Sequence, residues 1–361
     1  FVYSYAKKIF GKEFNFDLFK FPSHLDEALN KQLPTVLSFS NYSWNLELAY
    51  KFASVVKQRN PNVVTIFGGP NFPTVSDEML EFLKKYPNID FYIELEGELG
   101  FESLLKKLTK YNFDAVKLKQ NNETLLNTSY VYENRLIHGP KERIKDVNII
   151  PSPYLTGTLD KFFDLPLVPM VETTRGCPFS CTFCSDGSVI KNKVSRYDPQ
   201  RIKEELNYIA KKVKKIDELI ITDLNFGMYK QDIETAKVVA DIQQTYNYPT
   251  IMAASAGKNM PKRIIEVGKI IDDASNAGGD FTRINSISFS VDDPSSHQSE
   301  LRELAIQEAL EKASHYADLT GIILGPVLLL SEAGSSVSST FENYGMRAMA
   351  SAPYSTSISG G

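Results

Sequence analysis

The chain has 361 residues, of which 42% are hydrophobic and 23% are charged, and its formal net charge is −4. This composition is typical of a globular protein with room for two or three domains of about 100–200 residues each. The mild negative charge argues against a nucleic-acid partner, which would require a basic surface. No run reaches the roughly 18 apolar residues of a membrane span, so we expect no membrane-spanning segment.

The first 125 residues alternate short apolar runs with amphipathic stretches. Strand and helix patterns follow one another in pairs, at 35–40 and 45–60, at 62–69 and 76–86, and at 89–97 and 99–111. Such alternation indicates βαβ units around a parallel sheet. We therefore expect residues 1–125 to form a Rossmann-like α/β domain, whose ligand would lie at the carboxyl ends of the strands.

Two details of these helices can be predicted. Leu48, Phe52, Val55 and Val56 recur at helical spacing and are expected on one face of the helix at 45–60. Ser76 precedes the next amphipathic stretch and is expected to be its N-cap.

Residues 126–165 are more polar and irregular, and we expect them to link two domains. A second alternating series follows at 166–265, with strands expected at 165–176, 218–227 and 249–258 and a helix at 230–246. Another helix is expected after Asp198 and Pro199, an N-cap and first-turn pair. Its apolar face would consist of Ile202, Leu206, Ile209 and Val213. At about 30 residues for each βα unit, this region has room for three units, hence a partial (β/α) barrel.

The pattern changes after residue 266. Alternation predicts a strand at 284–291, followed by a long helix at 295–321 and a last strand at 326–334. Residues 266–333 are therefore expected to form a small α+β segment. The tail at 334–361 is rich in Ser, Ala and Gly and is expected to be disordered.

All three cysteines of the chain, Cys177, Cys181 and Cys184, fall within eight positions. Thiolates are soft ligands for zinc, copper(I) or iron–sulfur clusters. Structural zinc requires four ligands and a ferredoxin-type cluster requires a fourth thiolate, which this loop does not offer. Three thiolates would leave one iron of a [4Fe–4S] cluster open to an outside ligand. An odd number of cysteines in one loop is no disulfide framework, which indicates a reducing compartment.

The C-x3-C-x2-C spacing, the flanking TTRGCPFSC and the aromatic Phe183 before the last cysteine resemble the radical S-adenosylmethionine (SAM) superfamily. The resemblance implies that the three cysteines bind a [4Fe–4S] cluster, whose open iron binds SAM and whose electron cleaves it to a 5′-deoxyadenosyl radical. It also implies that Phe183 packs near the SAM adenine, that the substrate is a small molecule, and that flavodoxin or ferredoxin donates the electron. An oxygen-sensitive cluster implies a cytoplasmic location.

Most members of the superfamily hold the SAM amino group with a GGE motif after the second strand, where this chain has TDLNFG. On the resemblance, Asp223 or Asn225 accepts that hydrogen bond instead. The alternative for Asp223 is a solvated carboxylate at the end of a strand. Ser255 and Lys258, at the end of the third strand, are expected to reach the SAM carboxylate or ribose.

The stretches LSFSNYSWNLELA, VTIFGGPNFP and ELEGELGFESLLKKL resemble the cobalamin-binding domain of one radical SAM class. This implies that Ser40, Gly68 and Gly69 lie along the nucleotide tail of cobalamin, where small residues let the backbone approach closely. The D-x-H-x-x-G motif, whose histidine ligates cobalt in many cobalamin proteins, is absent. Either cobalamin binds without a protein imidazole, or the domain keeps the fold without the cofactor. Trp44 would then wall the corrin face or pack at the helix start.

After residue 265 the resemblance changes. RINSISFSVDDP and GPVLLLSEAG are similar to the SIMPL domain, an α+β module of bacterial envelope proteins. Three explanations stay open: a fused or misassembled gene product, a natural or deliberate fusion, and a divergent barrel half with an accidental likeness. His297 and His315 lie in this part without metal-like spacing and are interpreted as surface residues.

We therefore expect a radical SAM enzyme of the cobalamin-domain class, performing methyl transfer or carbon-skeleton chemistry. Two alternatives belong to other functional classes. One is an iron–sulfur or zinc-binding module without catalysis, and the other is an envelope-associated interaction protein of the SIMPL type.

Overall fold

The computed structural model describes residues 1–182, 184–277, 298–321, 323 and 325. By their internal contacts the residues form two units, Phe1–Ser288 and Phe289–Gly361. The strands expected at 284–291 and 326–334, His297 and the tail lie outside the described residues. In the second unit the long helix is present as α10 (Gln298–Thr320) and bears an exposed His315.

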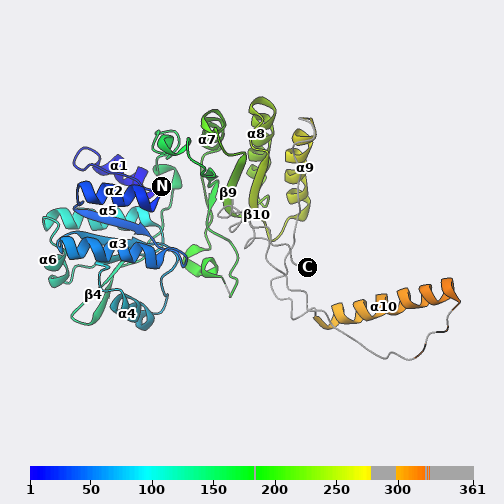
Figure 1. Ribbon diagram of the computed structural model, residues 1–361, viewed down its shortest axis with the longest axis horizontal. Coiled ribbons are helices and arrows are strands. Elements are labelled where there is room, and N and C mark those ends of the chain that lie inside the picture. Colours follow the sequence, from blue (N-terminus) through cyan, green and yellow to red (C-terminus); the bar gives the residue numbers. More distant parts are fainter. Residues whose placement is uncertain (183, 278–297, 322, 324, 326–361) are drawn as a thin grey trace, which may run out of the picture. The chain divides into compact units, whose positions relative to one another are not determined.

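The first unit begins with a five-stranded sheet in the order β1-β2-β3-β4-β5 (Figure 1). β1 (Val36–Ser40), β2 (Val64–Gly68) and β3 (Phe91–Ile93) are parallel, which confirms the expected parallel α/β arrangement. β4 (Thr128–Tyr132) and β5 (Arg135–His138) then add an antiparallel hairpin. This hairpin comes from the segment 126–165 that was expected to link two domains, and it extends the sheet.

Helices cover both faces of this sheet. They are α1 (Val2–Phe10), α2 (Pro22–Lys31), α3 (Leu46–Arg59), α4 (Ser76–Lys85), α5 (Gly97–Lys110) and α6 (Ala115–Gln120). Ile66 of β2 packs in a cluster with Leu104 of α5, while its neighbour Phe67 packs in another with Ala53 of α3. Because successive residues of a strand point to opposite faces, the two clusters are the two sides of one buried sheet.

Two sequence predictions for these helices need correction, the first of them in part. Val56 is buried and Phe52 packs beside it, as predicted for α3, whereas Leu48 and Val55 are 51% and 38% exposed. The other buried residues of α3 are Leu46, Ala49 and Ala53. The helix turns its alanines toward Phe67, because small residues let it approach the sheet closely. Ser76 is the first residue of α4 rather than its cap, since Val75 occupies the N-cap position and no side-chain capping bond forms.

A second, three-stranded parallel sheet has the order β10-β9-β6. Its strands are β6 (Met170–Val171), β9 (Glu218–Phe226) and β10 (Ile251–Ala256), and the helices beside it are α7 (Pro199–Lys212), α8 (Lys230–Tyr246) and α9 (Pro261–Ala277). The number of strands agrees with the expected three βα units. Asp198 caps α7 by accepting from the backbone N–H of Gln200 and Arg201, as predicted.

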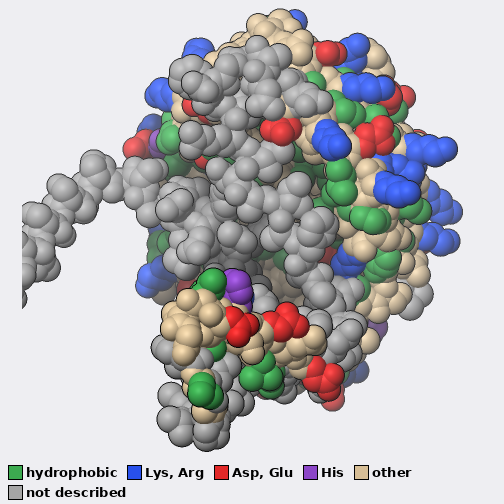
Figure 2. Space-filling view, turned by 90° about the vertical axis from the view of Figure 1, so that its right-hand side faces the viewer, with side chains coloured by type: hydrophobic (Ala, Val, Ile, Leu, Met, Phe, Trp, Pro, Cys, Tyr) green, Lys and Arg blue, Asp and Glu red, His purple; other side chains and the backbone are tan. Residues whose placement is uncertain are grey.

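Only one face of this second sheet is fully covered among the described residues. Ile221 of β9 is buried with Ile202, Leu206 and Ile209 of α7, which confirms the predicted face of that helix, and Val213 is partly buried beside them. On the other face Met170, Leu224 and Ile251 are 54%, 38% and 38% exposed. Figure 2 shows one side of the molecule, on which hydrophobic side chains lie among Lys and Arg side chains. Within the described part of the chain, no helix combines the length and apolar character needed to cross a membrane.

Candidate functional site

The cysteine loop, residues 176–194, is closed by a short hairpin. β7 (Thr174–Arg175) and β8 (Ser195–Arg196) pair antiparallel at its two ends. Gly176 has φ +105°, and a Cβ there would lie 2.5 Å from the carbonyl oxygen of Lys193. Only glycine adopts this conformation readily and leaves that room. The next residue, Cys177, donates its backbone N–H to Lys191 at 3.2 Å. The start of the loop therefore lies tightly against its end.

The three cysteines form no disulfide bond and differ in exposure. Cys177 is buried, while Cys181 and Cys184 are half-buried. Gly187 packs so closely that a Cβ there would lie 2.3 Å from the carbonyl oxygen of Cys181. Phe183, expected near the SAM adenine, lies outside the described residues. Within the described ranges, no three His, Cys, Asp or Glu side chains converge on one metal-ion position.

Two of the residues predicted to bind SAM contact the sulfur atoms. Asn225, near the end of β9, donates from Nδ2 to Cys177 Sγ at 3.2 Å. Lys258, just after β10, donates from Nζ to Cys181 Sγ at 2.7 Å. Hydrogen bonds to cluster sulfurs are one of the ways in which proteins tune reduction potential. The carboxyl ends of two neighbouring strands thus bring donors to two of the three cysteines.

Asn225 also carries an unpaired acceptor. Its Oδ1 atom is buried and has no hydrogen-bond partner among the described residues, and the residue as a whole is 2% exposed. An unsatisfied buried acceptor costs about 1–3 kcal/mol, so a donor from a bound group would be favourable here. Ser255, the third of these predicted residues, is half-buried on β10.

Asp223 lies differently from Asn225, two positions further on in the same strand. It is 2% exposed and accepts hydrogen bonds from Thr173 N at 2.7 Å, from Thr173 Oγ1, and from Thr174 Oγ1 at 2.8 Å. Burial raises the pKa of its carboxyl group, and the threonine donors oppose that rise. The interpretation of Asp223 as a solvated carboxylate was therefore wrong. Its oxygens hold the strand that leads into the cysteine loop.

Sequence reasoning missed a second buried carboxylate nearby. Asp232, 2% exposed in the first turn of α8, accepts from the backbone N–H of Tyr229 at 2.8 Å. Burial, followed by the negative charge of Asp223, raises the pKa of Asp232 to about 6. The signal was available, because an acidic residue three positions after a helix cap is typical of a capping box.

The three residues predicted to contact cobalamin lie at the carboxyl edge of the five-stranded sheet. Ser40, exposed at the end of β1, pairs in register with Gly68 at the end of β2. A Cβ on Gly68 would lie 3.2 Å from the carbonyl oxygen of Ile93 in β3. Gly69 has φ +133°, and a Cβ there would lie 2.5 Å from the carbonyl oxygen of Asn41. Glycine is therefore required at residue 69 by the packing of the two loops themselves.

A polar network not foreseen from the sequence ties these two loops together. Asn41, fully buried, donates from Nδ2 to the carbonyl oxygen of Asn71 at 2.9 Å and to the hydroxyl of Tyr92 at 2.8 Å. Tyr92 donates in turn to the carbonyl oxygen of Gly69 at 3.0 Å, and Phe72 stacks on its ring. Asparagines directly after a strand end are the only sequence signal for this network.

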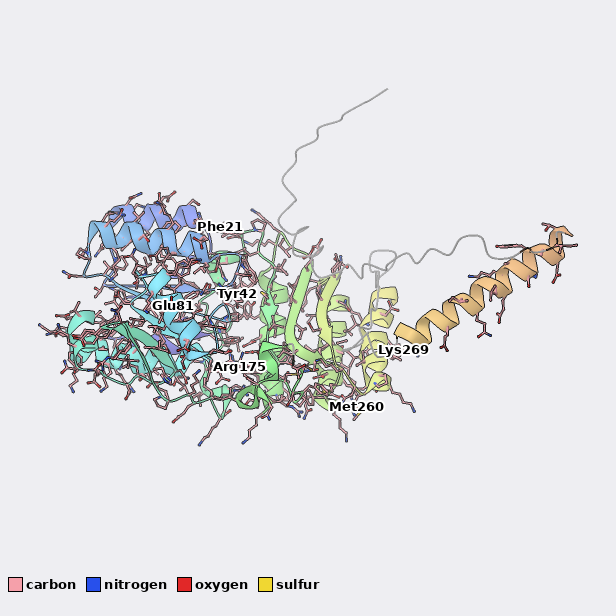
Figure 3. The ribbon with its side chains drawn as sticks, turned by 90° about the horizontal axis from the view of Figure 1, so that it is seen from below. Phe21, Tyr42, Glu81, Arg175, Met260 and Lys269 are labelled. Atoms are coloured by element: carbon pink, nitrogen blue, oxygen red, sulfur yellow. The ribbon has the colours of Figure 1, made fainter. Side chains whose placement is uncertain are left out.

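Trp44 is 76% exposed and stacks on Tyr42, with ring centroids 4.5 Å apart and an interplanar angle of 15°. It is not a packing residue at the start of α3, since most of its surface is open. The pair presents an aromatic surface just after the end of β1. Figure 3 shows Tyr42 with the surrounding side chains.

Comparison with known proteins finds methyltransferases among the relatives of this chain. Over 248 residues, 67% of its length, the chain is 31% identical to 2-(S-pantetheinyl)-carbapenam-3-carboxylate methyltransferase of Streptantibioticus cattleyicolor. It is 30% identical over 253 residues, again 67% of its length, to the cobalamin-dependent radical SAM methyltransferase TokK of Streptomyces tokunonensis. The chain covers 35% of each relative, so it spans about a third of their length.

A solved structure is also similar, that of the cobalamin-dependent S-adenosylmethionine radical enzyme OxsB with aqua-cobalamin and S-adenosylmethionine bound. The TM-score is 0.49 at 18% identity, over 71% of this chain and 36% of that one. The family model that matches is SIMPL, a protein of unknown function (DUF541), over residues 193–361. Both of these relatives are named methyltransferases, one of them a cobalamin-dependent radical SAM methyltransferase, and the same chain carries a SIMPL match, so both expected resemblances are confirmed. The SIMPL match begins before residue 266 and overlaps β9 and β10.

Proposed function

We propose that this chain is part of a cobalamin-dependent radical SAM enzyme whose cysteine loop holds a [4Fe–4S] cluster and whose N-terminal domain binds cobalamin. In this proposal residues 1–125 bind cobalamin and residues 166–265 form a partial barrel around the cluster. Residues 126–165 connect these two parts. Residues 266–333 are a SIMPL-like segment, followed by the tail at 334–361.

The observation that carries the proposal is the surroundings of the three thiols. Cys177, Cys181 and Cys184 would each bind one iron, and Asn225 and Lys258 already donate to two of the sulfurs. When bound, the cluster would supply one electron to the sulfonium of SAM and leave one iron for the SAM amino and carboxylate groups.

The chain's own residues would orient SAM. Asn225 Oδ1, buried without a partner among the described residues, would accept a hydrogen bond from the SAM ammonium group. Lys258 carries a positive charge beside Cys181, which would attract the SAM carboxylate, and Ser255 would reach the ribose. Phe183 would pack against the adenine. Asp223 is the weaker candidate of the predicted pair, because three donors already bind its oxygens.

Ser40, Gly68 and Gly69 would border the nucleotide tail of cobalamin, because they lie together at the carboxyl edge of a parallel sheet, where α/β folds bind ligands. The stacked Tyr42 and Trp44 would offer a flat apolar surface to the corrin ring. We favour methyl transfer to a small molecule, because both relatives are named methyltransferases. A one-electron donor such as flavodoxin or ferredoxin would reduce the cluster.

A cluster-binding module without catalysis is the second candidate. The open face of the three-stranded sheet favours it, since a complete barrel would bury Met170, Leu224 and Ile251. The two candidates share the cluster and differ in whether SAM binds.

The test is anaerobic reconstitution with iron and sulfide, metal analysis, and EPR of the reduced protein with and without SAM. The enzyme proposal expects a [4Fe–4S] signal that changes when SAM is added. It also expects a weaker change in Asn225→Ala, with Asn207→Ala, a partly exposed asparagine on α7, as the matched control. A cluster signal indifferent to SAM would support the module, and one zinc per chain would refute both candidates.

A further inference from the structure

The segment after β3 carries two buried carboxylates, Glu94 and Glu98, and one that is largely buried, Glu96. Glu94 and Glu98 are 8% and 3% exposed, and the side chain of Glu96 is 10% exposed. Glu94 accepts from Ser129 Oγ and pairs with Lys141 Nζ, both at 2.5 Å. Its partners lie on β4 and just after β5, away from the cysteine loop. Glu96 and Glu98 reach further, to arginines beside the cysteine loop.

Glu96 acts on the end of the cysteine loop. Its carboxylate accepts from Arg143 Nε at 2.9 Å and Nη2 at 2.8 Å, and from the backbone N–H of Ile144. Arg143 then donates from Nη1 to the carbonyl oxygen of Lys193 at 2.6 Å. That carbonyl is the atom against which Gly176 packs. One carboxylate thereby fixes an arginine that holds the loop at the point where its end meets its start.

Glu98 acts on the start of the loop. It pairs with Arg175 Nη1 at 3.3 Å, and Arg175 also contacts Glu172 Oε2 at 2.9 Å and the hydroxyl of Tyr197 at 3.1 Å. Arg175 is the last residue of β7 and lies two positions before Cys177. Figure 3 labels Arg175 and shows it among side chains of the first unit. Its guanidinium is thus surrounded by acceptors from both sides of the hairpin and from the N-terminal domain.

We propose that Glu96 and Glu98 are positioning residues that set the geometry of the three thiols. Through Arg143 and Arg175 they hold both ends of the cysteine loop against the N-terminal domain. The hairpin β7–β8 has only two residues in each strand and cannot be rigid by itself. Buried pairs between guanidinium and carboxylate groups have fixed directions, which a lysine could not reproduce. The five-stranded sheet, covered on both faces, would supply the rigid support.

This inference deepens the proposed function, because the supporting carboxylates follow β3 at the edge proposed for cobalamin. Its test nevertheless needs neither cofactor. The rate at which iodoacetamide alkylates Cys177 is measured by mass spectrometry on the anaerobic, metal-free chain. Glu96→Gln and Glu98→Gln, singly and together, remove the charge and keep the shape. Glu94→Gln is the matched control, since it breaks a buried pair of the same segment that does not touch the loop.

We expect iodoacetamide to alkylate Cys177 about tenfold faster in the double variant than in the wild type, because the loop opens locally more often. The alkylation rate of Cys177 in Glu94→Gln should stay within about twofold of the wild-type rate. In Glu98→Asp, which keeps the charge, most of the protection should remain and the rate should stay close to the slow wild-type rate. Equal rates in all variants, or an equal rise in Glu94→Gln, would overturn the proposal. If the double variant fails to fold by circular dichroism, Arg143→Lys is used, with the same expected rise.

Failure of the proposed function would look different. A wild-type chain that takes up no cluster refutes that function, while the alkylation rates still decide the positioning role. Where a cluster is bound, the positioning role also predicts a changed EPR line shape in Glu98→Gln and an unchanged one in Glu94→Gln.

Discussion

The two sheets of the first unit are both parallel at their centre, yet they differ in how they are covered. The five-stranded sheet has helices on both faces, so neighbouring residues such as Ile66 and Phe67 are both buried. In the three-stranded sheet Ile221 is buried, and its neighbour Ile220 lies on the face with exposed Met170. The difference teaches that the two sheets are buried unequally among the described residues. The apolar side chains of the five-stranded sheet are covered on both faces, whereas the three-stranded sheet keeps one face partly exposed.

The largest effect is expected at the loop itself. Cys184→Ala should abolish formation of a [4Fe–4S] cluster, because each thiolate would hold a separate iron and the chain has no other cysteine to replace it. Iron and sulfide analysis after anaerobic reconstitution measures this. Ser188→Ala, a change in the same loop without loss of a thiol, is the control. Retention of a full cluster in Cys184→Ala would refute the assignment of ligands.

The comparison of the sheets predicts how much substitution by alanine at neighbouring residues lowers the free energy of unfolding. In the five-stranded sheet Ile66→Ala and Phe67→Ala should each lower the free energy of unfolding by about 3 kcal/mol or more. In the three-stranded sheet Ile221→Ala should cost a similar amount, while Ile220→Ala should cost about 1 kcal/mol. Urea denaturation measures all four. Equal costs at Ile220 and Ile221 would mean that the second sheet is covered on both faces.

Because Asp232 is buried, we predict that the stability of the partial barrel depends on pH. Its pKa is raised from 3.8 to about 6 in the folded state, so the folded protein binds the proton more tightly than the unfolded chain. Stability from this group is present below the unfolded pKa and is lost as pH rises toward about 6, by about 3 kcal/mol in total. Thermal unfolding of Asp232→Asn at several pH values should lack this loss. Glu234→Gln, an exposed change on the same helix, should retain it.

Substitution of alanine for either of two glycines should change the stability of the protein in opposite directions. Gly69→Ala places a Cβ 2.5 Å from the carbonyl oxygen of Asn41 at φ +133°, and should destabilise the protein by about 2 kcal/mol. Gly268→Ala lies in α9 with nothing within 4 Å of its Cβ, and should stabilise by about 0.8 kcal/mol. The difference in melting temperature between the two variants measures this. Stabilisation by Gly69→Ala would show that the loops after β1 and β2 pack less closely than described.

The sequence by itself determined the alternation of strands and helices at 35–111 and at 166–258 and the place of the cysteine loop, but not the hairpin of β4 and β5. Local patterns suffice for this, because apolar periodicity and signals such as Asp198 with Pro199 act over a few neighbouring residues. The thiol spacing and the two family resemblances were likewise visible in Cys177, Cys181 and Cys184 and the stretches around them. The helix face of α3 was misjudged, since periodicity does not say which of two adjacent stripes meets the sheet.

Only the tertiary structure decided which polar residues share a site. Asp223 and Asn225 are two positions apart in one strand, yet one binds threonines and the other contacts a cysteine sulfur. Glu94 and Glu96 look alike in the sequence, yet the partner of Glu96, Arg143, also binds the carbonyl oxygen of Lys193 in the cysteine loop. These assignments depend on contacts between residues about 50 positions apart, as with Arg143 and Lys193. Such contacts form only when the sheets pack, because no local pattern encodes a partner that distant.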